Sequence, residues 1–173
     1  MTASLSAEPS AVALAPCARC ASVRRTCCQR AEILLTERDV ERISAHAGGM
    51  DFHERRVPGD PSYAAAHEDD PEWLDLTCAA DGTRRMLRRQ ANGDCVFLGE
   101  AGCGLALGVR PLICRLYPFS YNAGGLTGRD EHYCPTELLA PRGQPMTDVL
   151  GIDGAAAERW RASLYEELRH GRP

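Results

Sequence analysis

The cysteines of this chain constrain its fold more than any other feature of the sequence. Nine cysteines occur in 173 residues, and eight of them form two groups. The first group is a C-x2-C pair followed, after six residues, by two adjacent cysteines; the second is spread over residues 95–134. The odd total leaves at least one cysteine outside any complete disulfide pairing. The grouped cysteines are Cys17, Cys20, Cys27, Cys28, Cys95, Cys103, Cys114 and Cys134.

The spacing of the first group is typical of metal-binding cysteines. Two residues between cysteines allow a tight turn to direct both sulfurs at one ion, at about 2.3 Å for zinc. Adjacent cysteines rarely both reach one ion, so one of Cys27 and Cys28 is expected to pack beside the site or to serve a second centre. Cys78 has no cysteine neighbour, and we expect it to pack as a small apolar residue. We predict that the eight grouped cysteines hold an iron–sulfur cluster or Zn2+.

Glycines and arginines accompany the second group. Three glycines within residues 99–104 allow the chain to double back, so that Cys95 and Cys103 can face one another. Arginines beside Cys114 would lower its pKa and offset the charge of a four-thiolate centre. These arginines are Arg110 and Arg115. His132, two residues before Cys134, is the one histidine we retain as a candidate ligand.

Composition and charge argue against several classes of protein. A net charge of −4 disfavours a nucleic-acid binder, and aromatic residues make up only 6% of the chain, so platforms for base stacking are scarce. All 20 basic residues are arginine, which excludes a lysine nucleophile and is typical of a GC-rich bacterial genome. No stretch approaches the ~18 apolar residues of a membrane span, and residues 1–16 lack the basic start of a signal peptide. We therefore expect a cytoplasmic protein, in which clustered cysteines are metal ligands more often than disulfides.

The expected fold class is α+β: a small, loop-rich, cysteine-cluster metal-binding domain with short helices and a small hairpin or sheet. Residues 1–16 are predicted to be a flexible leader and 17–140 the metal-binding domain. Residues 141–173 are predicted to be a linker and an amphipathic helix that packs on the domain.

Local signals predict individual elements. Thr36 and Asp39 form a capping-box pattern for a helix that ends at Gly48-Gly49. The stretch 153–169 places apolar residues at helical spacing. Residues 110–116 are predicted to form a short helix that ends before Pro118.

Three further segments are interpreted from turn signals and composition. Asp81-Gly82 predicts a hairpin between strands at 74–78 and 83–89, and 94–98 is another candidate strand. Residues 17–30 are expected to be a loop, and 50–71 an exposed connection.

The cysteine motifs also occur in a characteristic order. CARC and CC at 17–28 are followed by C-x-F-L at 95–98, Cys103 and RPLICRLYP at 110–118. This combination resembles the YkgJ-type cysteine-cluster family, described as a zinc- or iron-chelating domain, over most of the chain. The resemblance implies metal chelation. In the family, two or three residues commonly separate the second cysteine of the C-x2-C pair from the CC pair, whereas six residues, 21–26, separate them here. This longer spacing leaves open which of Cys27 and Cys28 is a metal ligand.

We therefore expect a metal-binding protein with a redox, sensing or accessory role. Such a role is compatible with a protein partner that the sequence does not identify, and neither nucleic acid nor membrane is expected. One alternative is a metal-dependent group-transfer enzyme that acts on protein side chains, since the resemblance extends distantly to flagellin lysine-N-methylase. Another is a structural zinc interaction module. The chain contains no GxSxG, HExxH or phosphate-loop motif, so no catalytic residue is assigned.

Overall fold

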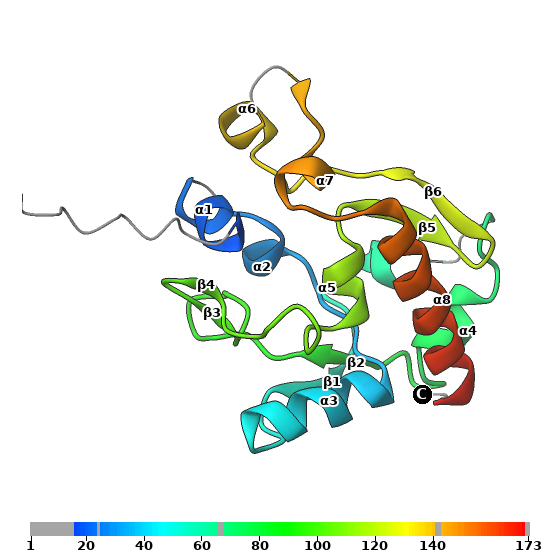
Figure 1. The fold of residues 1–173 in the computed structure, drawn as a ribbon. Helices are drawn as coiled ribbons and strands as arrows, with labels where there is room; N and C mark the ends of the chain where they lie inside the picture. Colours follow the sequence, from blue (N-terminus) through cyan, green and yellow to red (C-terminus); the bar gives the residue numbers. More distant parts are fainter. Residues whose placement is uncertain (1–15, 24, 66–67, 141–142, 172–173) are drawn as a thin grey trace, which may run out of the picture.

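The computed structural model describes residues 16–23, 25–65, 68–140 and 143–171, without the side chains of Pro16, Cys17 and Ala64. Within these residues the chain forms short helices and three separate two-stranded antiparallel sheets (Figure 1). The predicted α+β class is confirmed. No helix among the described residues is long and apolar enough to cross a membrane.

The elements are short, apart from α3 and α8. The helices are α1 (Pro16–Val23), α2 (Cys27–Arg30), α3 (Glu37–Ala47), α4 (Trp73–Thr77), α5 (Leu112–Leu116), α6 (Thr136–Leu139), α7 (Met146–Val149) and α8 (Gly154–His170), with a 3-10 turn at Pro61–Ala64. The strands are β1 (His53–Arg56), β2 (Arg84–Leu87), β3 (Leu98–Gly99), β4 (Gly102–Cys103), β5 (Phe119–Asn122) and β6 (Gly125–Arg129). They pair as β1–β2, β3–β4 and β5–β6.

Capping residues determine where helix α3 begins and ends. The Thr36 hydroxyl accepts a hydrogen bond from the Asp39 backbone N–H at 2.9 Å, and the Asp39 carboxylate accepts one from the Thr36 N–H at 3.1 Å. The helix ends at Gly48, whose φ of 72° is left-handed and therefore suits glycine. Both predicted ends are confirmed, and α3 buries Val40 and Ile43 in the core.

Helix α8 covers α5 and is the longest element. Asp153 caps it by accepting a hydrogen bond from the Ala156 N–H at 3.1 Å. Its apolar face, which includes Leu164 and Leu168, packs in one cluster with Leu112 and Leu116 of α5. In Figure 1, α8 lies on one side of α5 while α1 and α2 lie on the other. The predicted terminal helix is confirmed.

The predicted hairpin around Asp81-Gly82 is wrong in its first arm. Residues 73–77 form helix α4, because a helical turn allows both Trp73 and Leu76 to reach the cluster beneath α8. The second arm is a strand, but β2 pairs with β1, with His53 opposite Leu87. The segment 50–71, expected to be only a connection, therefore supplies a strand of the fold.

Glu32 holds the loop that follows β1. Its carboxylate accepts hydrogen bonds from the Gly59 N–H at 3.0 Å and the Asp60 N–H at 3.3 Å, and forms an ion pair with Arg56 at 2.5 Å. Burial opposes ionisation of this carboxyl, but the three donors outweigh burial and lower its pKa.

The stretch 17–30, predicted to be a loop, instead contains α1 and α2. Thr26 begins α2 with a capping box, in which its N–H donates to the Gln29 side chain at 3.0 Å. Helix α1 packs against β4 so closely that a Cβ at Gly102 would lie 2.8 Å from the Ala18 nitrogen. Gly102 also has a φ of 96°, so this contact depends on glycine.

Candidate metal centre

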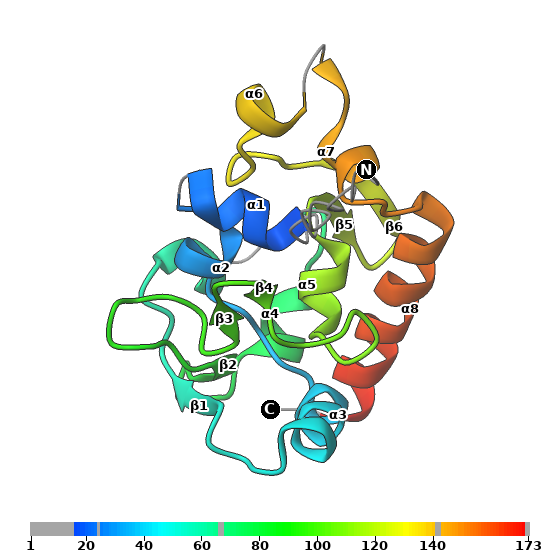
Figure 2. The ribbon, with the colours of Figure 1, turned by 60° about the vertical axis from the view of Figure 1, so that its left-hand side comes forward.

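Five cysteines line a cavity of about 190 Å³, here called the central cavity. They come from four separate parts of the chain: α2, the segment after β2, β4 and α5. Figure 2 shows α2, the β3–β4 hairpin and α5 grouped around one region. The five are Cys27, Cys28, Cys95, Cys103 and Cys114.

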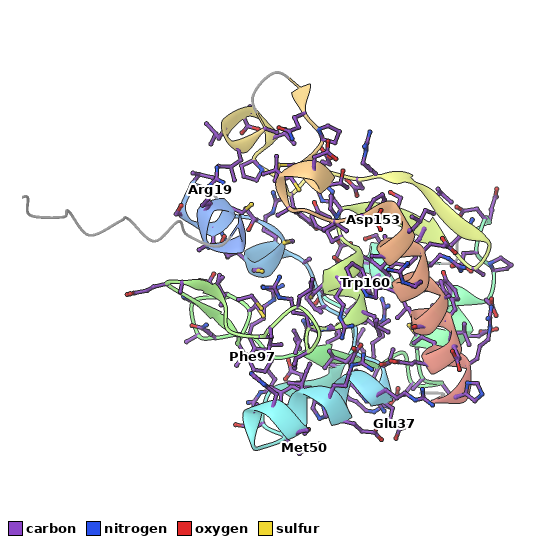
Figure 3. All side chains as sticks on the ribbon, in the orientation of Figure 1. Arg19, Glu37, Met50, Phe97, Asp153 and Trp160 are labelled. Carbon is purple, nitrogen blue, oxygen red and sulfur yellow. The ribbon has the colours of Figure 1, made fainter. Side chains whose placement is uncertain are left out.

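A second cavity of about 260 Å³, the lateral cavity, shares three of these cysteines. Cys27, Cys28 and Cys114 line both cavities, whereas Cys20 of α1 and Cys134 line only the lateral one. Every grouped cysteine whose side chain is described therefore lines at least one cavity. Figure 3 shows sulfur atoms on α1 and α2 and on the facing β3–β4 hairpin. Cys17 lies in α1, but its side chain is outside the described residues.

A backbone hydrogen bond joins the two sequence groups of cysteines. The Cys95 N–H donates to the Cys28 carbonyl at 2.7 Å, which joins the segment after β2 to α2. On the lateral side, the Cys134 thiol donates to the Tyr117 hydroxyl at 3.7 Å. The structure records no disulfide among the eight cysteines whose side chains are described.

Burial raises the pKa of four cysteines of the central cavity: Cys28, Cys95, Cys103 and Cys114. The hydrogen bond with Cys27 and burial raise the pKa of Cys28, and burial raises the pKa of Cys95 to about 11. Burial and the neighbouring thiols raise the pKa of Cys114. Thiolates are the form that binds metal, so metal binding here would release protons and be pH-dependent.

Two arginines oppose the rise in the pKa of these thiols. The Arg110 guanidinium lowers the pKa of both Cys28 and Cys103 against their burial, and Arg89 does the same for Cys28 and Cys95. Arg110 was anticipated from its position beside Cys114. Arg89 was missed, and nothing in the cysteine motifs indicates it: its backbone bridges to Cys95 only in the folded chain.

Arg115, the other arginine expected beside the thiolates, has a different role. It donates to the carbonyls of Arg110 and Gly108, each at 2.8 Å, and so fixes the turn before α5. His132 is exposed, lines neither cavity, and lies 2.8 Å from the Asp130 carboxylate. Cys78 is half-buried and also lines neither cavity, in keeping with its expected separation from the group.

The donor set fits a thiophilic metal, although the sulfurs do not meet at one point. Among the described residues, no three histidine, cysteine or carboxylate side chains are arranged to hold an ion between them. The sulfurs instead surround a cavity whose other walls include Leu87, Phe97, Leu105 and Ile113. Soft thiolates suit zinc and iron–sulfur centres, and apolar walls exclude competing water.

Comparison with known proteins agrees with this donor set. The model of the CxxCxxCC family, described as "Putative zinc- or iron-chelating domain", matches residues 16–135. No curated protein and no solved structure matches the chain significantly. The matched segment contains all eight grouped cysteines and more than half of the sequence. The chain therefore belongs to the CxxCxxCC family.

Proposed function

We propose that the protein binds an iron–sulfur cluster in the central cavity through Cys28, Cys95, Cys103 and Cys114. The observation that carries the proposal is the enclosure of these four sulfurs, from distant segments, around one cavity of about 190 Å³. Four thiolates are the usual ligands of such clusters. Arg89 and Arg110 lie close enough to Cys28 to offset the negative charge of the loaded centre.

The arrangement of the sulfurs favours a cluster over a single zinc ion. Tetrahedral zinc needs four ligands at about 2.3 Å, so its sulfurs lie about 4 Å apart. The described thiols do not converge in this way, whereas an inorganic core with several atoms can span the cavity between them. When bound, a cluster supplies one-electron chemistry, which suits a role in electron transfer or redox sensing.

The remaining thiols form a separate set. Cys20, Cys27 and Cys134 line the lateral cavity, and Tyr117 accepts a hydrogen bond from Cys134 there. We assign Cys28 to the central cavity and Cys27 to the lateral one, because the backbone of Cys28 is hydrogen-bonded to that of Cys95 at 2.7 Å. The described members of this set do not converge on one point either, so we assign no metal to them.

Purification without oxygen tests the proposal. The protein is expected to be brown, to absorb near ~400 nm, and to contain iron with acid-labile sulfide. A colourless protein that contains zinc but no sulfide would refute the cluster and select the zinc form.

Three serine variants test the ligand assignment. Cys114→Ser is expected to remove the absorption, because Cys114 is buried against the other thiols of the central cavity. Cys78→Ser, outside both cavities, and Cys134→Ser, on the lateral side only, are expected to retain it. Loss of the absorption in Cys134→Ser would contradict the division of the cysteines into two sets, and loss in Cys78→Ser would contradict the assignment as a whole.

A further inference from the structure

Arg84 is a buried arginine without an acidic partner. The residue lies on β2, is 2% exposed, and is among the largest side chains that the fold encloses completely. Within the described parts of the chain, its guanidinium forms no ion pair with a carboxylate, and its Nε has no hydrogen-bond partner. Arginine is almost never fully buried unless it is paired, because an isolated charge is costly to remove from water.

The neighbours of Arg84 do not supply the missing negative charge. The guanidinium donates a hydrogen bond to the Tyr63 carbonyl and lies 5.8 Å from the centroid of the Tyr63 ring. Burial raises the pKa of Tyr63 to about 12 and raises that of Tyr121 as well, so both hydroxyls are neutral near pH 7. The carboxylate of Glu32 acts on Arg84 more weakly than burial does, and it is already paired with Arg56.

Cys78 is the neighbour of Arg84 across a turn. The Ala79 N–H donates to the Thr83 carbonyl at 2.8 Å, which places Cys78 and Arg84 next to one another at the base of this turn. The thiol is half-buried, and its ionisation would act on the guanidinium. A protonated thiol is neutral, so the described surroundings give Arg84 an ionisable neighbour and no permanent anion.

The central cavity lies next to the same tyrosines that enclose Arg84. Tyr63 and Tyr121 both line this cavity. Burial raises the pKa of Tyr121, the charge of Arg84 lowers it, and the charge of Cys114 raises it further. The Tyr121 side chain is therefore close to both the buried arginine and a proposed ligand of the cluster. Charges interact more strongly across buried, apolar surroundings than through water.

We infer that Arg84 is a charge-compensating residue of the proposed centre: its positive charge, held behind Tyr63 and Tyr121, offsets the negative charge of the thiolate-bound cluster. The negative charge that Arg84 lacks among the described side chains is the charge that a bound centre supplies. This inference rests on the proposed function. It applies to zinc as well as to a cluster, because four thiolates leave a zinc centre with a net negative charge.

The midpoint potential of the cluster in the full-length protein, measured by spectroelectrochemical titration, tests the inference. Arg84→Met replaces the charged side chain with an apolar one. It is expected to favour the oxidised cluster about tenfold, which for one electron lowers the midpoint potential by about 59 mV, because a nearby cation stabilises the added electron. Arg84→Gln, whose amide can still donate to the Tyr63 carbonyl, is expected to lower the potential equally. It decides the outcome if circular dichroism shows that Arg84→Met is not folded. A role in packing alone would leave the potential of both variants unchanged, and this result would overturn the inference.

Two control variants separate the charge of Arg84 from its surroundings. Arg85→Met changes the adjacent arginine of β2, which is half-buried, lines neither cysteine cavity, and interacts with the charges of Arg55 and Glu37. It is expected to leave the potential unchanged, and a fall equal to that in Arg84→Met would overturn the inference. Cys78→Ser is also expected to have no effect. A rise in its potential would show that the Cys78 thiol already neutralises Arg84, and would overturn the inference as well.

The metal content distinguishes failure of this inference from failure of the proposed function. A brown protein whose potential does not depend on Arg84 would refute the inference and leave the cluster standing. If the protein contains zinc but no sulfide, the cluster is refuted, and competition with a chelator replaces the potential as the measurement. Arg84→Met is then expected to bind zinc about tenfold more weakly than the wild type and Arg85→Met, and equal affinities would overturn the inference. A protein that binds no metal would refute both.

Discussion

Glu167 connects the two longest helices, and its replacement tests how α8 is held on the domain. The side chain is 8% exposed. Its carboxylate accepts a hydrogen bond from the Thr36 hydroxyl at 2.5 Å and one from the Arg42 guanidinium at 2.8 Å. Glu167→Gln keeps the shape of the side chain but replaces one acceptor oxygen with an NH2 group, which cannot accept either bond.

The expected cost follows from these partners. A hydrogen bond to a charged group contributes about 1.5–3 kcal/mol, and the glutamine retains one neutral bond. The Arg42 side chain is 30% exposed, so solvent screening reduces the contribution of the ion pair. We therefore expect Glu167→Gln to lower the free energy of unfolding by about 2 kcal/mol, and Tm by about 4–8 °C for a chain of this length.

Thermal and urea unfolding, followed by circular dichroism, measure this loss. The control is Glu166→Gln, the exposed neighbour on the same helix, which is expected to change stability by less than about 0.5 kcal/mol. If the two variants have the same Tm and the same urea midpoint, the buried carboxylate does not hold α8, and the reasoning is refuted.

Two further changes test the surroundings of the cysteines. The pKa of Glu32 is lower in the folded protein than its ordinary value of 4.5, so the ionised carboxylate stabilises the fold above pH 4.5. This stabilisation is lost as the pH falls through the pKa of the folded state. The loss of unfolding free energy caused by Glu32→Gln, measured in urea, should therefore become smaller below pH 4.5. The exposed Glu100→Gln should show no such pH dependence, and a cost that stays constant down to pH 2 would contradict the assignment. Gly102→Ala should destabilise the protein by about 1–2 kcal/mol or more and lower its metal content, because the new Cβ meets Ala18 at a left-handed φ. In Gly99→Ala the nearest contact is 3.9 Å, so equal destabilisation of both variants would contradict the close approach of α1 and β4.

Elements with local signals were predictable from the sequence. The ends of α3 were recognised because Thr36 and Asp39 cap each other within four residues and Gly48 ends the helix. The same holds for α8, whose cap Asp153 immediately precedes the helix. The strand pair β1–β2 was missed because its strands are about thirty residues apart and pair only through long-range packing, which no local signal encodes.

Some features of the candidate site were likewise predictable from the sequence, and others were not. The spacing of the cysteines predicted that their sulfurs gather, and the described ones line two adjoining cavities. The cavity that each sulfur lines depends on how α1, α2 and α5 pack, so the hydrogen bond between Cys28 and Cys95 could not be deduced from the sequence. Arg89 was missed for the same reason.

The wide separation of the cysteines along the chain has a consequence for biosynthesis. Cys27 and Cys28 leave the ribosome well before Cys95, Cys103 and Cys114, and therefore before the apolar walls that will later enclose them. During that interval their thiols are open to oxidants and to stray metal ions, with the ordinary acidity of unfolded cysteine. The cavity that these thiols line therefore cannot form until the segments around Cys95, Cys103 and Cys114 have been synthesised and have folded.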